Sequence, residues 1–148
     1  MDKSDAASVI KKLIETCKDG EEGYRNAAEH AKSSELQSFF REQSSERGRF
    51  AQELQAQLSK VGEAGEKESG SVSAALHRAW IDTKAALGGG DHTILESVEQ
   101  GEDAAKKAYE EAAHASLPAD VAAIVSRQAE RIRAGHDRAR DLRDNHAA

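Results

Sequence analysis

The sequence predicts an all-α protein, a four-helix bundle in which two antiparallel helical hairpins are joined by a long crossover. One proline among 148 residues and a charged fraction of 32% are typical of long amphipathic helices rather than strands. Apolar residues recur at spacings of three and four in four long segments, as in helices with one buried face. Two connections are only a few residues long, whereas residues 62–92 separate the two halves.

The first two helices form the first hairpin. The first is expected from Ser4 to Ala31, and the second opens at Ser34, where Ser34–Gln37 resembles a capping box. So short a connection makes the two helices antiparallel. Their apolar stripes consist of Ile10, Leu13, Ile14, Cys17, Tyr24, Ala28 and Ala31, and of Leu36, Phe39, Phe40, Phe50, Leu54 and Leu58. Because Cys17 lies on the stripe, its expected role is to fill the core.

The crossover contains a linker and a short extra helix. Residues 61–70 are polar and glycine-rich, which ends the second helix. Residues 72–87, including Trp80, form an amphipathic segment that is expected to lie against the bundle until Gly88–Gly90 stops it.

The second hairpin repeats the plan of the first. Thr93–Glu96 resembles a capping box that opens a third helix ending near Ala115. Leu117 and Pro118 open a fourth helix that ends near Asn145. Two hairpins with one long crossover have the connectivity of ferritin-like bundles. The chain is therefore expected to form a single domain over residues 1–148.

An internal repeat relates the two hairpins. The segment Glu15–Glu22 returns as Glu96–Asp103, at an offset of 81 residues. The second and fourth helices align more weakly. The two hairpins are therefore expected to be halves related by a pseudo-twofold axis.

Charge and composition exclude several functions. The net charge is −6 without a compact basic block, so nucleic-acid binding is disfavoured. The sequence has neither a signal-peptide core nor eighteen consecutive apolar residues, so we expect a cytoplasmic protein without membrane contact. Cys17 is the only cysteine, which excludes an intramolecular disulfide and a cysteine zinc cluster.

Several polar side chains are predicted to face the bundle interior. At 100° per residue, Glu21 lies about 40° from Cys17, and Glu102 about 40° from Val98, so both carboxylates point inward. Their neighbours Glu22 and Asp103 are expected to be solvated. Gln43 and Gln128 interrupt the centres of two apolar stripes, Glu46, Arg47 and Arg131 flank the same stripes, and His136 lies where it could reach the cavity edge.

Each unpaired charge in such an interior would cost several kcal/mol. Two solutions remain open, a bound cation or a closed network of ion pairs and hydrogen bonds among these side chains. Glu111 and His114 also have metal-ligand spacing, but they are expected on the outward face of the third helix.

Four segments carry a resemblance to a known family: Cys17–Arg25, Ala75–Trp80, Gln100–Ala104 and His136–Arg140. They resemble a bacterial four-helix-bundle family of unknown function (domain of unknown function 2383), classed in the ferritin-like superfamily. The resemblance covers nearly the whole chain. It implies the bundle fold and descent from metal-binding bundles, and it implies no demonstrated reaction.

Ferritin-like di-iron proteins use one Glu from each of two helices and a Glu-x-x-His motif from each of the other two. Glu21 and Glu102 match the lone carboxylates, but Gln43-x-x-Glu46 and Gln128-x-x-Arg131 stand where the motifs would be. We therefore expect a non-enzymatic protein with a degenerate metal site. It would act through an unknown protein partner, through self-association, or as a stress-associated factor.

The alternative expectation is a redox or storage protein in which Glu21, Glu46 and Glu102 hold iron or manganese. A third is a self-assembling structural protein that uses the crossover helix with Trp80.

Overall fold

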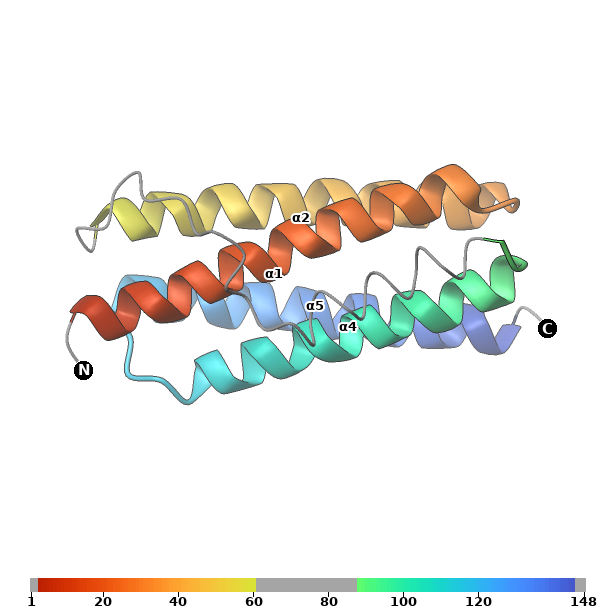
Figure 1. Ribbon diagram of the computed structural model, residues 1–148. Helices are drawn as coiled ribbons and strands as arrows, with labels where there is room; N and C mark the ends of the chain where they lie inside the picture. Colours follow the sequence, from red (N-terminus) through yellow and green to blue (C-terminus); the bar gives the residue numbers. More distant parts are fainter. Residues whose placement is uncertain (1–2, 61–87, 146–148) are drawn as a thin grey trace.

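The computed structural model describes residues 3–60 and 88–145, with side chains from Ala6 onward. These residues form the helices α1 (Lys3–His30), α2 (Ser34–Lys60), α4 (Asp91–Ala113) and α5 (Ala119–Asn145), and no strand occurs among them. The predicted all-α four-helix bundle is confirmed (Figure 1). The predicted helix over residues 72–87 lies outside the described residues.

The helices run up, down, down and up (Figure 1). α1 and α2 are antiparallel, as are α4 and α5, while α2 and α4 run in the same direction. α2 ends at one end of the bundle and α4 begins at the other, so the chain crosses the length of the bundle between them. This is the predicted pair of hairpins with one long crossover.

The start of α2 differs by one residue from the predicted capping box. Ser33 rather than Ser34 caps the helix, because its hydroxyl oxygen accepts a hydrogen bond from the Leu36 N–H at 3.4 Å. The Gln37 amide, expected to reach back to the cap, donates instead to the Ala31 carbonyl at 2.8 Å. The turn between α1 and α2 is therefore closed from both sides.

The predicted capping box at Thr93–Glu96 is wrong. α4 begins at Asp91, and its N-cap Gly90 is extended and makes no side-chain cap bond. The Asp91 carboxylate accepts the backbone N–H groups of Lys32 and Ser33, at 2.8 and 2.9 Å. A carboxylate in the first turn also suits the positive end of the helix dipole, so the cap, Gly90, lies three residues before the predicted cap Thr93.

The core is divided into two apolar clusters along the bundle. One contains Ile10, Leu13, Cys17, Phe50, Leu54, Tyr109, Val125 and Ile132, and the other contains Tyr24, Leu36, Phe40, Ile94, Leu95, Val98 and Leu142. Arg47 lies between Phe40 and Phe50 on α2, and Glu102 follows Val98 on α4. A charged layer therefore lies where the two clusters meet.

Candidate functional site

The centre of the bundle holds a buried ion pair between Arg47 of α2 and Glu102 of α4. Arg47 Nη2 lies 2.6 Å from Glu102 Oε2, and the two side chains are 1% and 0% exposed. Burial lowers the pKa of the Arg47 guanidinium, but the charge and hydrogen bond of Glu102, together with Tyr24 and Cys17, outweigh burial and hold the pKa above its ordinary value. Arg47 therefore stays charged and neutralises Glu102.

Tyr24 of α1 completes this cluster. Its hydroxyl donates to Glu102 Oε2 at 2.6 Å, so one carboxylate oxygen accepts both an O–H and an N–H donor. The Arg47 guanidinium carbon lies 5.4 Å from the centre of the Tyr24 ring, within the range of a cation–π contact. Burial, together with the Glu102 charge, raises the pKa of Tyr24 well above its ordinary value, so its hydroxyl stays a donor.

Two glycines leave room for this cluster. A Cβ on Gly135 of α5 would lie 2.8 Å from Gln43 Oε1 and 2.9 Å from Glu102 Oε2. A Cβ on Gly20 of α1 would lie 3.1 Å from Arg47 Nη1. Both helices therefore approach the ion pair with backbone alone.

A hydrogen-bonded chain extends from the core beside this cluster to the surface. The Tyr109 hydroxyl donates to Gln128 Oε1 at 2.7 Å, which leaves the Cys17 thiol as the donor in its 3.0 Å contact with the same hydroxyl. Gln128 Nε2 then donates to Glu53 Oε1 at 2.8 Å, and Glu53 pairs with Arg127. Burial raises the pKa of Cys17 to about 11 and that of Tyr109 well above its ordinary value.

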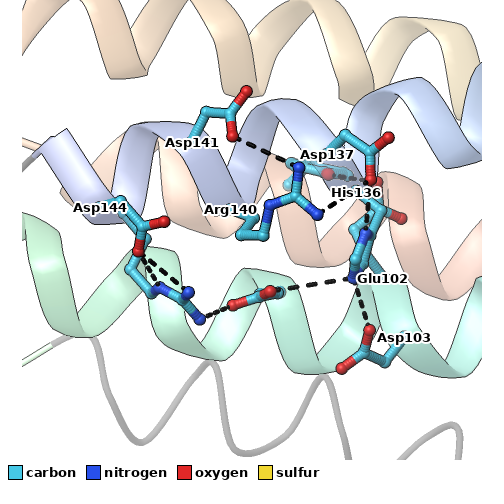
Figure 2. A network of polar contacts seen from close by, with 10 residues as sticks. Glu102, Asp103, His136, Asp137, Arg140, Asp141 and Asp144 are labelled. Carbon is cyan, nitrogen blue, oxygen red and sulfur yellow. Dashed lines mark hydrogen bonds and ion pairs between the residues drawn. The ribbon is translucent and has the colours of Figure 1, made fainter.

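His136 lies at the edge of the interior, as predicted, and joins α5 to α4 (Figure 2). Its Nε2 lies 2.6 Å from Asp103 Oδ1 and 3.8 Å from Glu99 Oε2. Its Nδ1 lies 3.2 Å from Asp137 Oδ1, and this hydrogen bond lowers the pKa of Asp137. Asp103 is solvent-exposed, as expected, yet it is also a partner of the buried imidazole.

Charged side chains continue this network along the surface of α5. Arg140 pairs with Asp137 and Asp141, and Arg143 pairs with Asp144 and with Glu99 of α4 (Figure 2). Alternating signs of charge therefore tie the last turns of α5 to each other and to α4.

The structure separates the predicted metal carboxylates. Glu102 is fully buried, but the Glu21 side chain is 34% exposed and lies 3.6 Å from Arg25. Glu46 is 13% exposed and accepts a hydrogen bond from Arg131 Nε at 3.0 Å. The three side chains thus face different surroundings instead of a common cavity.

Gln43, Arg47 and Gln128 are buried, as predicted, but the inclusion of Arg131 in the interior network is wrong. Its side chain is 56% exposed. The inward face of α5 passes through Gln128, Ile132 and Gly135, which leaves Arg131 at the edge toward α2, where its head group reaches water.

These donors do not fit the two-metal site of the ferritin-like proteins. Among residues 6–60 and 88–145, no three His, Cys, Asp or Glu side chains are arranged to hold a metal ion. The group beside Glu102 is a guanidinium, which would repel a second cation at that oxygen. Two buried oxygens, Glu46 Oε1 and Glu102 Oε1, have no hydrogen-bond partner.

Sequence reasoning missed the polar roles of two tyrosines and the role of Gly135. The sequence pattern places Tyr24 on the apolar stripe. Because a buried tyrosine needs a partner for its hydroxyl, its position there could have predicted a polar contact. Tyr109 lies 92 positions from Cys17 and in the other hairpin, so the sequence gave no local signal for their contact. Gly135 is one residue from His136, and its importance appears only when the helices are packed.

The family model described as Domain of unknown function (DUF2383) matches residues 5–115. The chain belongs to the DUF2383 family. This match contains all but the first two residues of α1 and the whole of α2 and α4, and with them Tyr24, Arg47 and Glu102. A search of curated proteins found no match for this DUF2383 chain. Within the described residues, no helix combines the length and apolarity needed to span a bilayer.

Proposed function

We propose that this DUF2383 protein is a cytoplasmic, ferritin-like bundle that acts by binding a protein partner, in a stress-associated role, and catalyses no reaction. The observation that carries the proposal is the ion pair between Arg47 and Glu102, at 2.6 Å in the bundle centre. The positive charge that a metal ion would supply to Glu102 comes from the protein itself.

The chemistry of the surrounding groups supports this proposal. Iron and manganese sites need several carboxylate or imidazole ligands around one point. Here the nearest donors to Glu102 are the Tyr24 hydroxyl and the Arg47 guanidinium, and both already bond to its Oε2. His136 follows Gly135, which lies against Glu102, but its imidazole is already paired with Asp103 and Asp137. Because Glu102 Oε2 is already bonded in this way, the protein would act through its surface.

Elemental analysis tests the proposal directly. The protein is purified without chelators or affinity metal, soaked with ferrous iron or manganese, and passed through a desalting column. We expect no stoichiometric metal and no consumption of oxygen or peroxide. One or two ions per chain, together with oxygen or peroxide consumption, would show that the proposal is wrong.

A second candidate is a weakly held cation, favoured by the unpartnered buried oxygens Glu46 Oε1 and Glu102 Oε1. Glu21 would be its third carboxylate, and binding would have to turn the three side chains toward one another, because they face different surroundings in this structure. If metal is found, Glu102→Gln and Glu21→Gln should abolish uptake while far-ultraviolet circular dichroism shows unchanged helicity. Unchanged uptake in both variants would place the metal elsewhere and remove this candidate.

A further inference from the structure

Among the described helices, the seam between α2 and α5 is the most loosely packed. α1 packs closely on α2 and α4 on α5, whereas α2 and α5 make the fewest close contacts of the neighbouring helix pairs. Long side chains bridge them instead, with Arg127 paired to Glu53 and Arg131 to Glu46. A groove of about 430 Å³ lies along this seam, and a second of about 380 Å³ adjoins it.

The two walls of the larger groove carry opposite charges. The charged residues that α2 contributes are Glu35 and Glu42, and those that α5 contributes are Arg131 and Arg138. Arg138 and Glu35 are only loosely paired, at 4.0 Å and with both side chains more than half exposed. Glu42, which lines both grooves, has no ion-pair partner among the described residues.

The floor of the groove is formed by small and uncharged groups. Phe39 and Gln43 come from α2, and Ala134 and Gly135 come from α5, so side chains of a facing helix have room between the charged walls. Gln43 is more than nine-tenths buried, and its Oε1 has no hydrogen-bond partner.

We propose that this groove is the docking surface for a second copy of the chain. The inference rests on the proposed function, because it names the surface and the partner through which a non-catalytic bundle acts. A twofold axis along the seam lays α2 of each subunit over α5 of the other. Glu42 then faces the gap between Arg131 and Arg138 of the partner subunit, so both walls meet opposite charge.

The size of the surface sets the strength of this dimer. From Glu35 to Arg49, the lining of the two grooves extends over ~21 Å of α2, and two helices side by side are ~20 Å wide. The flat area is therefore ~400 Å² per subunit, about half that of a standard stable interface. The dimer is expected to be weak, and since its contacts are charged, it should dissociate as salt is raised.

Complementary charge reversals test the proposal in the full chain. Glu42→Arg leaves the α2 wall without net charge, because Glu35 remains, and Arg138→Glu does the same to the α5 wall, because Arg131 remains. Each residue is exposed, so neither change should affect folding, which circular dichroism checks. Sedimentation equilibrium at low salt and high protein concentration then compares wild type, each variant alone and their equimolar mixture.

We expect wild type to dimerise and each variant alone to bind itself at least about tenfold more weakly. The mixture should form a heterodimer more tightly than either variant binds itself, because it keeps one of the two oppositely charged wall pairs of the wild-type dimer. Glu22→Arg and Arg133→Glu are the matched controls, because they make the same charge changes on exposed positions away from the grooves and should dimerise as wild type does.

Three results would overturn the inference: a wild-type monomer at every concentration, variants that dimerise like the controls, or folded variants that do not bind each other. None of these depends on metal content. A metal-free monomer therefore rejects the groove dimer and leaves the proposed function standing, whereas stoichiometric metal together with oxygen or peroxide consumption rejects the proposed function whatever the oligomeric state.

Discussion

Replacing Arg47 by Met should destabilise the bundle far more than the loss of a surface ion pair. The change keeps an unbranched apolar side chain in place and leaves the Glu102 carboxylate, which is fully buried, without its cation. Breaking a buried pair on one side costs about 3–5 kcal/mol of unfolding free energy. In a chain of this size, that cost corresponds to a fall in Tm of roughly 6–20 °C.

Urea titration followed by circular dichroism measures this loss. Two companion variants test whether it comes from the unpaired buried charge. Arg131→Met removes a guanidinium that is more than half exposed, so it should cost no more than about 1 kcal/mol. Adding Glu102→Gln to Arg47→Met removes the unpaired charge but keeps an acceptor for the Tyr24 hydroxyl, so it should restore part of the lost stability. A loss below about 1 kcal/mol for Arg47→Met, or a double variant as unstable as the sum of the two single changes, would refute the reasoning.

Three other perturbations probe the same region. Tyr24→Phe removes the hydroxyl that donates to Glu102 at 2.6 Å, so it should lower the free energy of unfolding by about 1–3 kcal/mol in a urea titration. Gly135→Ala places a methyl group against two side-chain oxygens and should lower Tm, whereas Gly88→Ala, which meets nothing within 4 Å, should leave it unchanged. Burial raises the pKa of Cys17 to about 11, so a thiol reagent at pH 8 should label it only after urea unfolds the chain; rapid labelling of the native protein would contradict this.

The fold was predictable because long-range architecture follows here from local patterns. Apolar spacing fixed four helices, and short connections fixed two antiparallel pairs. The helix starts were less predictable. Ser33 caps α2 through a local bond to Leu36, but the backbone N–H groups of Lys32 and Ser33 also donate to Asp91 at the start of α4, across 59 and 58 positions. A capping motif read from four consecutive residues contains no information on such partners.

The candidate site was predictable only in part, because a helical wheel gives direction and not depth. It correctly placed Glu102, Gln43 and Gln128 inside. It also predicted that Glu21 faces inward like Glu102, the residue to which the sequence repeat relates it. The repeat does not extend to the side-chain contacts. Glu102 pairs with Arg47, whereas Glu21 lies beside Gly48 and the solvent-exposed Arg25.

The charged layer joins residues that lie far apart along the chain. Arg47 and Glu102 are separated by 55 positions, and Tyr24 and Glu102 by 78, whereas α1 meets α2 across a loop of three residues. Closing a short loop costs less entropy than closing a long one, so each hairpin forms before the two hairpins meet. Arg47 and Glu102 therefore stay hydrated until the two hairpins pack together. Removing this water costs little free energy only when the packing places the two side chains against each other. The order of folding thus makes the buried pair a check on how the two hairpins are matched.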